Sequence, residues 1–254
     1  MTDEPLIAVF IDFENLALGV ADKKSAAREF NIDVILKRLL ERGRIVLKRA
    51  YCDWSAYREA VRDFHSRGVE LIDIPRSRMS GKNSADIHMV VDALELCHTK
   101  EHIDIFALLS GDSDFSPLVG KLKENDKRVI GCGVKSSTSD LLVNSCDEFI
   151  FYDDLVSAAK RSRPRPAKKD GKSDKRQEGV EIMMETIYSL VVDYDPLWGS
   201  LVKQTLRRVY PDFTEAKYGF KSFGELLKEA EKAGQIELSY DNERGNYKIR
   251  LRDE

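Results

Sequence analysis

The stretch IDIFALLSGDSDF (residues 103–115) runs from a continuous apolar segment straight into a short polar turn. An apolar run bounded by turn residues is typical of a buried strand. Gly111 permits the turn, and Asp112 and Asp114 follow it two residues apart. Two carboxylates so close repel each other unless a positive group lies between them. The stretch therefore predicts a buried strand that ends either in a helix-capping turn or in a cation site.

The chain around this stretch alternates between strand-like and helix-like segments. Strand-like runs occupy residues 6–12, 45–52, 69–74, 103–110 and 128–134, and FIFY (149–152) is a candidate sixth. Residues 33–43, 55–68, 84–100 and 115–125 have the apolar spacing of amphipathic helices. This alternation predicts an α/β fold, in which a parallel sheet has helices on both faces.

Length and composition limit the class of protein. The chain has 254 residues, 42% of them hydrophobic, which is enough for one large domain or two smaller ones. No apolar run approaches the roughly 20 residues that span a bilayer, and the start MTDEP is acidic where a secretory signal would be basic. We expect a soluble protein of the cytoplasm with no membrane partner. The four cysteines, which form no CxxC pair, are expected to be core residues.

A basic segment divides the chain. Residues 158–178 hold nine Lys or Arg against three acids, two prolines and no apolar periodicity. We expect a flexible linker between a domain at residues 1–157 and a second at 179–254. The net charge of −3 conceals +6 in this linker, against −6 before it and −3 after it. The linker acts either as a solvated tether or as a holder of a polyanion.

Several acids follow strand-like runs. Asp12, Asp53 and the pair Asp112 and Asp114 each come directly after one. Ligands of an open parallel sheet bind at the carboxyl ends of its strands. If the strand order is 3-2-1-4-5, Asp12 and the Asp112 pair share one site. Asn15 lies one helical turn after Asp12, so its amide is placed to orient a carboxylate, a water or a phosphate.

Two further acids lie on the expected helix at residues 84–98. Its apolar residues Ile87, Val90, Val91 and Leu94, together with His98, predict one buried stripe. Asp92 points away from that stripe, and Asp86 lies at its flank in the first turn. Asp86 therefore reaches the strand ends more easily, although a first-turn acid also complements the helix dipole. On this geometry Asp92 is a solvated acid or an outer one that braces a ligand.

The chemistry of these acids points to a hard cation. Oxygen ligands suit Mg²⁺ or Mn²⁺, and such an ion can support phosphodiester hydrolysis. Lys82 either neutralises a substrate phosphate or is simply solvated. No HExxH, GxxxxGK[ST] or GxGxxG pattern and no Ser/His/Asp order is present, which disfavours zinc peptidases, nucleotide-binding enzymes and acyl-transfer triads.

Residues 6–152 resemble the NYN domains, PIN-like (Rossmannoid) ribonucleases that include the bacterial LabA-like proteins. The similarity rests on VFIDFEN, KNSADIHMVVDALE and LLSGDSDFSPLV, in that order. It implies a metal-dependent endonuclease acting on RNA, in which Asp12, Asp86, Asp112 and Asp114 bind Mg²⁺ or Mn²⁺. It also adds Asp92 to the candidate metal ligands, because an acid commonly occurs at that position in the family. Asp53, in YCDW, matches less well.

Residues 179–254 resemble an OST-HTH or LOTUS domain, a small winged-helix α+β module associated with RNA or with protein partners. Residues 201–209 and 223–230 have helical spacing, and QIELSY and NYKIRL flank DNERG as a β-hairpin. Candidate RNA-binding residues of this module are Lys217, Tyr218, Phe220, Lys221, Arg244 and Lys248. The aromatic residues among them are alternatively core or turn-packing side chains.

The favoured hypothesis is a metal-dependent endoribonuclease with a C-terminal RNA-binding module. An RNA-binding or regulatory adaptor with weak or no catalysis is the alternative. A phosphotransfer protein with Asp12 as nucleophile is less favoured, because Glu14 stands where a DxD motif has its second Asp. The sequence indicates neither an RNA preference nor an oligomeric state.

Overall fold

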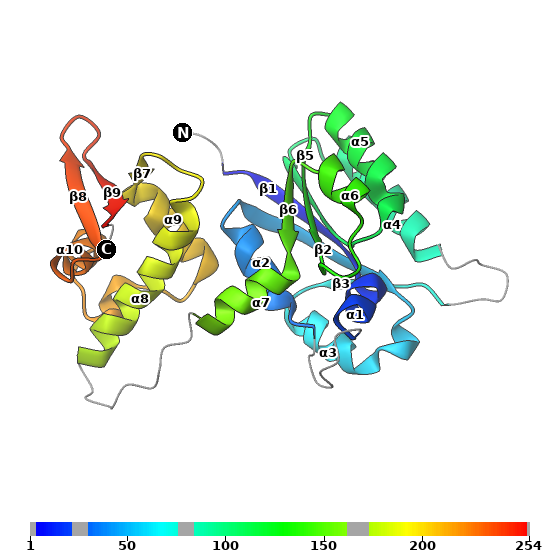
Figure 1. Ribbon diagram of the computed structural model, residues 1–254, viewed down its shortest axis with the longest axis horizontal. Coiled ribbons are helices and arrows are strands. Elements are labelled where there is room, and N and C mark those ends of the chain that lie inside the picture. Colours follow the sequence, from blue (N-terminus) through cyan, green and yellow to red (C-terminus); the bar gives the residue numbers. More distant parts are fainter. Residues whose placement is uncertain (1–3, 22–29, 76–83, 162–172, 253–254) are drawn as a thin grey trace. The chain divides into compact units, whose positions relative to one another are not determined.

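The computed structural model describes residues 4–21, 30–75, 84–161 and 173–252 (Figure 1). These residues fall into two compact units, within Met1–Arg161 and Ser162–Glu254. Buried apolar clusters of the first unit are drawn from residues 7–152, and that of the second from residues 180–249. Each unit therefore has the separate core that an independent domain needs.

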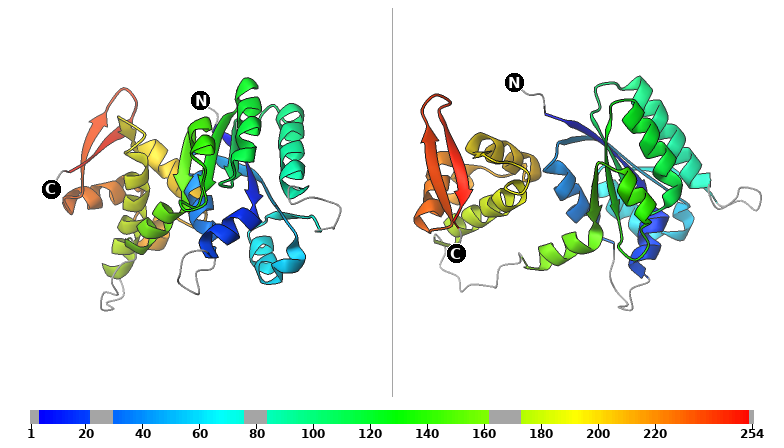
Figure 2. Two further views of the ribbon diagram at one scale, coloured as in Figure 1. Left: turned by 45° about the vertical axis from the view of Figure 1, so that its right-hand side comes forward. Right: turned by 45° about the horizontal axis from the view of Figure 1, so that its top comes forward.

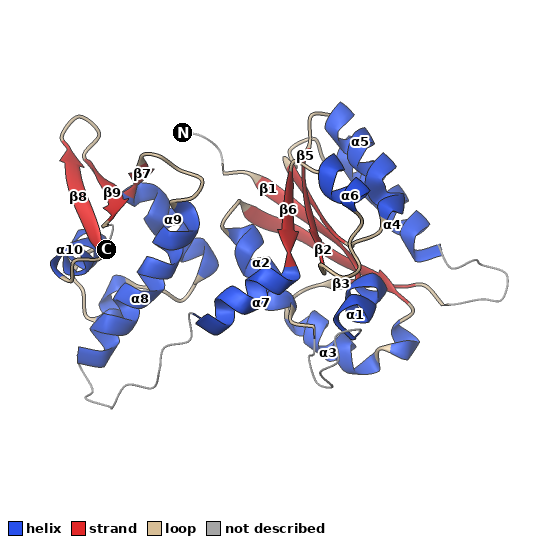
Figure 3. Ribbon diagram, in the orientation of Figure 1, coloured by secondary structure: helices blue, strands red, loops and turns tan. Residues whose placement is uncertain are grey.

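The first unit is built on a six-stranded parallel sheet in the order β3-β2-β1-β4-β5-β6 (Figure 3). The strands are β1 (Leu6–Asp12), β2 (Arg44–Cys52), β3 (Glu70–Asp73), β4 (Ile105–Leu109), β5 (Arg128–Gly133) and β6 (Glu148–Phe151). The order 3-2-1-4-5, on which a shared site of Asp12 and Asp112 was conditional, is the observed one, and the candidate sixth strand extends the sheet beyond β5. Because β1 pairs directly with β4, the carboxyl ends of these two strands lie side by side.

Helices cover both faces of this sheet, as predicted (Figure 2). One face carries α1 (Phe13–Ala21), α2 (Ile32–Leu40), α3 (Arg58–Ser66) and α7 (Tyr152–Arg161), and the other carries α4 (Ser84–Thr99), α5 (Ser116–Glu124) and α6 (Asp140–Ser145). Side chains of a strand alternate between faces, so Val9 and Ile11 pack on the first group while Ala8 and Phe10 pack on the second. Burial on both faces explains why the central strands β1, β4 and β5 are nearly continuous apolar runs.

Three helices of the first unit were not predicted: α1, α6 and α7. α6 is short and begins at a cap, where the Ser139 hydroxyl accepts a hydrogen bond from Leu141 N at 3.2 Å. α7 begins at Tyr152, which the sequence had assigned to the sixth strand. Tyr152 is buried and its hydroxyl accepts a hydrogen bond from Asn31 N at 2.9 Å, so a tertiary contact fixes this residue.

Both predicted bounds of the linker, residues 158 and 178, fall inside helices. α7 continues to Arg161, and α8 (Ser173–Leu190) begins before residue 178, while residues 162–172 lie outside the described part. Lys, Arg, Glu and Gln are good helix formers, so a charged composition does not prevent a helix. Arg176 also stacks on Phe220 at 4.1 Å and donates to Gly219 O at 2.6 Å, which ties α8 to its own domain.

The second unit combines helices with a small antiparallel sheet in the order β7-β9-β8 (Figure 1). Its further elements are β7 (Leu197–Trp198), α9 (Gly199–Val209), the 3₁₀ turn η3 (Glu215–Tyr218), α10 (Phe223–Lys232), β8 (Ile236–Asp241) and β9 (Asn246–Leu251). The two predicted helices and the hairpin are confirmed. α8 was missed, but it supplies Met183 and Ile187 to the core.

The helices and the cysteines bear on two further expectations drawn from composition. None of the helices within the described ranges is long and apolar enough to cross a bilayer. All four cysteines are free thiols, of which Cys52, Cys97 and Cys132 are buried and Cys146 is partly buried. They are packed as core residues, as expected.

Candidate functional site

Asp12 ends β1 at the carboxyl edge of the sheet and is only 7% exposed. The buried strand β1 ends at this residue and therefore places its carboxylate at the carboxyl end of the sheet. Asp12 Oδ1 accepts a hydrogen bond from Asn15 N at 3.2 Å, and Oδ2 accepts one from the Ser110 hydroxyl at 2.9 Å. Both oxygens of this carboxylate are therefore held in place.

The end of β4 is joined to the end of β1 through the same residues. Gly111 N donates to Asn15 Oδ1 at 2.9 Å, and Asp112 N donates to the hydroxyl of the fully buried Ser110 at 3.2 Å. Ser110 thus contacts Asp12 and Asp112 at once. The structure brings these two predicted acids together across neighbouring strands.

The loop after β5 closes tightly over this junction. A Cβ atom at Gly111 would lie 2.6 Å from the backbone oxygen of Ser137, closer than real Cβ atoms approach. Ser139 N also donates to Gly111 O at 2.9 Å. Glycine is needed here because another backbone passes directly against it.

Four acids form one electrostatic group. Burial, together with the charges of Asp86 and Asp112, raises the pKa of Asp12 from 3.8 to about 6, although hydrogen bonds from Ser110 and Asn15 lower it. Burial, followed by the charges of Asp112 and Asp114, also raises the pKa of Asp86 above its usual 3.8. The negative charge gathered at this edge is therefore incompletely compensated by the protein.

Asp86 lies in the first turn of α4, as predicted, but the buried stripe of that helix was predicted only in part: Val90 and Leu94 pack on the core, and His98 is exposed. Met89, Ala93, Leu96 and Cys97 face the core, whereas Ile87 and Val91 are 62% and 56% exposed. The small Ala93 and Cys97 lie on this stripe, and Ile87 and Val91 turn outward to solvent. On the observed stripe Asp86 faces the sheet, which explains why it interacts with Asp112.

Asp92 does not join the four acids. Its Oδ2 accepts a hydrogen bond from the Tyr51 hydroxyl at 2.7 Å and lies 3.4 Å from Arg49 Nη1. Both partners belong to β2, so Asp92 fastens α4 to the sheet. The resemblance implied a ligand here, and the geometry instead fits the outer acid that residue spacing had suggested.

Two of the acids that follow strands cap short 3₁₀ turns. Asp53 Oδ1 accepts a hydrogen bond from Ser55 N at 3.1 Å and caps the 3₁₀ turn η1 (Trp54–Ala56). Asp112 Oδ1 accepts one from Asp114 N at 3.0 Å and caps η2 (Ser113–Phe115). The capping interpretation of the opening stretch thus holds for the 3₁₀ turn η2, whereas α5 begins without a side-chain cap from Ser113 or Asp114. The side chain of Asp114 is exposed, and its charge reaches Asp86.

Not every candidate is in a position to bind RNA. Lys82 lies outside the described residues. Tyr218 and Phe220 are 5% and 3% exposed and belong to the core of the second unit, so they are packing aromatics and offer no open ring face. Phe213 stacks on Tyr218 at 4.9 Å between ring centroids, and Arg176 covers Phe220.

The cationic candidates of the second unit lie at its surface. Lys217 pairs with Asp212 at 2.5 Å. Lys221 is exposed, and its backbone N donates to Glu225 Oε2 at 2.7 Å. Arg244 is exposed in the β8–β9 turn, and its guanidinium carbon lies 4.8 Å from the Trp198 ring centroid. Lys248 lies 5.2 Å from the same ring.

Three contributing residues were missed from the sequence: Ser110, Tyr51 and Trp198. Ser110 had a signal, since it is the single polar residue between an apolar run and Gly111. Tyr51 is paired with Asp12 in the sheet register, which no local pattern reveals. Trp198 gains its neighbours from the pairing of β7 with β9, which also joins distant segments.

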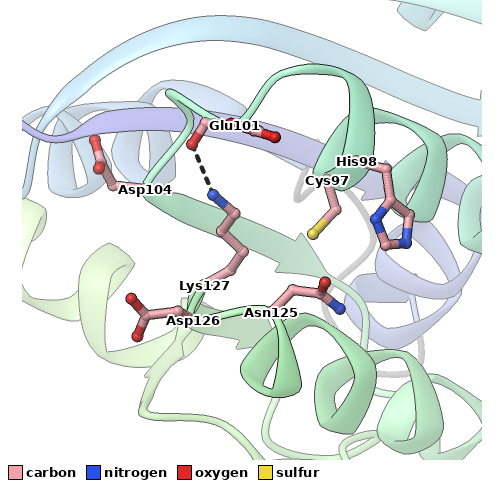
Figure 4. Close-up of a pocket in the computed structure, with 7 residues that line it drawn as sticks. All are labelled: Cys97, His98, Glu101, Asp104, Asn125, Asp126 and Lys127. Atoms are coloured by element: carbon pink, nitrogen blue, oxygen red, sulfur yellow. Dashed lines mark hydrogen bonds between the residues drawn. The ribbon is translucent and has the colours of Figure 1, made fainter.

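The amino ends of β4 and β5, opposite the candidate site, carry a second group of polar side chains. A shallow hollow there is lined by Cys97, His98, Glu101, Asp104, Asn125, Asp126 and Lys127 (Figure 4). Lys127 Nζ donates to Glu101 O at 2.8 Å, and Asp104 Oδ2 accepts from Leu6 N at 2.8 Å. These hydrogen bonds hold together the segments at which β1, β4 and β5 begin. Nowhere in the described residues do three Asp, Glu, His or Cys side chains already close around one point as metal ligands do.

Comparisons with known proteins agree with the fold. The chain matches the family model described as NYN domain over residues 6–153. It is 30% identical over 170 residues to an uncharacterized protein of Methanocaldococcus jannaschii, covering 64% of this chain and 68% of that protein. A crystal structure of a protein of unknown function from Vibrio parahaemolyticus aligns with a TM-score of 0.53 and 25% identity, covering 61% of this chain and 97% of the other.

The matched range holds the whole six-stranded sheet and the four acids of the carboxyl edge. The NYN family is in general a family of nucleases, which are hydrolases. PIN-like nuclease domains usually use divalent metal ions. The chain therefore belongs to the NYN family, and residues 6–153 are its NYN domain.

Proposed function

We propose that the NYN domain is a metal-dependent endoribonuclease that hydrolyses RNA phosphodiester bonds. The observation that carries this proposal is the contact of Ser110 with both Asp12 and Asp112, which assembles acids from two strand ends beside Asp86 of α4. Nuclease activity is general in the family, and RNA is the substrate that a domain of this type suggests.

The donor set fits Mg²⁺ or Mn²⁺. Asp12, Asp86, Asp112 and Asp114 offer only carboxylate oxygens, which these hard cations prefer, and their mutual repulsion calls for a positive charge. We assign these four residues as the metal ligands. A divalent ion bound there would activate a water and stabilise the charge that develops on phosphorus.

The surrounding residues have positioning roles in this proposal. Ser110 and Asn15 orient Asp12, and Asn15 uses its side-chain oxygen on Gly111 N, so we assign it to positioning and not to metal binding. Asp92 holds α4 through Tyr51 and thereby places Asp86. Asp53 caps η1 and is left out of the ligand set.

We further propose that the second unit is an OST-HTH or LOTUS winged-helix domain that binds RNA. Its helices, its three-stranded sheet and its exposed hairpin cations support this proposal. The core positions of Tyr218 and Phe220 move the expected RNA surface from η3 to the hairpin.

The test is a cleavage panel of single-stranded RNA, structured RNA and DNA, with Mg²⁺, Mn²⁺ or chelator. The full chain is compared with residues 1–161, since α7 ends at Arg161. We expect metal-dependent internal cleavage of RNA by both proteins, with weaker RNA binding by the shorter one. Binding of RNA without cleavage under every condition would contradict the enzyme assignment and favour a regulatory adaptor.

A further inference from the structure

Trp198 lies on the outer face of the small sheet. It pairs with Lys248 in the register of β7 with β9, while the neighbouring pair Leu197 and Ile249 is buried in the core. Since side chains alternate along a strand, Trp198 and Lys248 face away from that core. The Trp198 ring is half-buried, and the β8–β9 turn that carries Arg244 extends beyond the helices (Figure 1).

Two cations gather on this one indole. The Arg244 guanidinium carbon and Lys248 Nζ lie 4.8 and 5.2 Å from the centroid of the Trp198 ring. The turn is fixed from within, because Arg244 N donates to Asp241 Oδ1 at 3.0 Å. The backbone of Arg244 is therefore held in place before any ligand arrives.

Arg244 differs from the other cations that cover rings in this unit. Arg176, Lys203 and Lys217 each pair with a carboxylate, and Lys248 lies 3.5 Å from Asp241 Oδ2. Within residues 173–252, the Arg244 guanidinium has no carboxylate partner. Because the Arg244 side chain is exposed, its N–H groups and the side of the guanidinium away from the ring are open to an anionic or aromatic ligand.

We propose that Trp198, Arg244 and Lys248 form a binding site for single-stranded RNA. A base stacks on the surface made by the indole and the guanidinium plane, and a neighbouring phosphate accepts hydrogen bonds from Arg244 and Lys248. This site rests on the proposed function for its ligand class. Bases inside a duplex are already stacked on each other, so the site selects single strands.

Stacking contributes more here than charge. Asp241 and Glu243 lie in the same hairpin as Arg244 and Lys248, so the local net charge is close to zero. Two phosphate contacts at most predict a salt dependence with a log–log slope no steeper than about −1.4. A polyanion-binding surface made of many cations would give a much steeper slope.

The test uses the full chain in chelator, so that RNA is not cut, with a fluorescein-labelled ten-residue oligouridine, alone or annealed to oligoadenine. Anisotropy gives the affinity, and tryptophan emission reports the site, since the other tryptophan, Trp54, is only 6% exposed in the first unit. The variants are Arg244→Ala and Trp198→Phe. Lys228→Ala is the matched control, because Lys228 is an exposed cation on α10.

We expect Arg244→Ala to weaken single-strand binding at least about fivefold, the lower range for losing one stacked base. Trp198→Phe should lose the RNA-induced change in emission, and Lys228→Ala should bind as the wild type does. Equal binding by Arg244→Ala and Lys228→Ala would overturn the site, as would equal affinity for duplex or no binding to the wild type. Cleavage of the same RNA with Mn²⁺ is scored separately, so loss of this site and loss of the nuclease assignment are distinguishable.

Discussion

The hydroxyl of Ser110 donates a hydrogen bond to Asp12 Oδ2 at 2.9 Å, from the end of the neighbouring strand. The same hydroxyl accepts one from Asp112 N at 3.2 Å, so a single buried oxygen sets the relative position of two acids. The β1–β4 pairing therefore determines the geometry of the candidate site, more than the short motif does by itself.

Replacing Ser110 by Ala is expected to raise the pKa of Asp12 further above its present value of about 6, because a hydrogen bond that lowers it is lost. A hydrogen bond to a charged group contributes about 1.5–3 kcal/mol to stability. Carboxyl NMR titration in chelator and urea unfolding measure the two effects. Ser113→Ala, in the same turn, is the control, and an unchanged pKa of Asp12 in Ser110→Ala would contradict the assignment.

Replacing Gly111 by Ala is expected to destabilise the NYN domain by about 2 kcal/mol or more, because its new methyl group would meet the Ser137 backbone. Gly120→Ala is the matched control. No atom of the described residues lies within 4 Å of a Cβ at that exposed position of α5, so the substitution should stabilise the protein by up to about 1 kcal/mol. Opposite signs in urea unfolding are the expected result, and equal effects would argue against the close approach.

Replacing Tyr51 by Phe is expected to cost about 1–3 kcal/mol, because the buried hydroxyl that holds Asp92 is removed. RNA cleavage should also fall, since α4 carries Asp86. Unfolding and cleavage rates are measured together. Tyr240→Phe, at a half-exposed position of the second unit, should change neither, and a fully active Tyr51→Phe would show that Asp92 does not position α4.

Glu148 provides a stability test that depends on pH and lies away from the candidate site. Burial would raise the pKa of Glu148, but hydrogen bonds from Arg42 and the nearby Arg128 lower it below its usual 4.5. The carboxylate therefore contributes stability above pH 4.5, and this contribution is lost as the pH falls through the lowered pKa.

Glu148→Gln is expected to cost up to about 3 kcal/mol at pH 7, because Arg42, whose side chain is 7% exposed, loses a partner. The difference from the wild type should shrink in more acidic urea titrations. Glu124→Gln removes an ion pair that is 61% exposed on both sides and should cost less than about 1 kcal/mol. A pH-independent cost in Glu148→Gln would contradict the role of its charge.

Much of the first domain was predictable because its central strands β1, β4 and β5 are buried on both faces and read as plain apolar runs. The strand order could only be assumed from the sequence, and the observed pairing of β1 with β4 meets the condition under which Asp12 lies beside Asp112. Local spacing did not predict which side of α4 faces the sheet. Ile87 and Val91 have the residue types of a core but are exposed, whereas the small Ala93 and Cys97 are buried. Helix phase depends on how closely two surfaces approach, which is a tertiary property.

The second domain shows the same limit. The hairpin and two helices were predictable from local pattern, but the burial of Tyr218 and Phe220 depends on α8, whose start was hidden in a charged segment. Arg176 was counted among the linker cations, yet it contacts Phe220 and Gly219 inside the domain. Charge along a sequence does not distinguish a solvated cation from one that packs on a ring.

The most direct test of the central claim is RNA cleavage in Mn²⁺ by Asp12→Asn beside Asp53→Asn. Both substitutions neutralise an acid at a strand end of the same sheet edge, but only Asp12 belongs to the proposed ligand set. We expect folded Asp12→Asn to lose cleavage and Asp53→Asn to cut at the wild-type rate. Wild-type cleavage by folded Asp12→Asn would contradict the account.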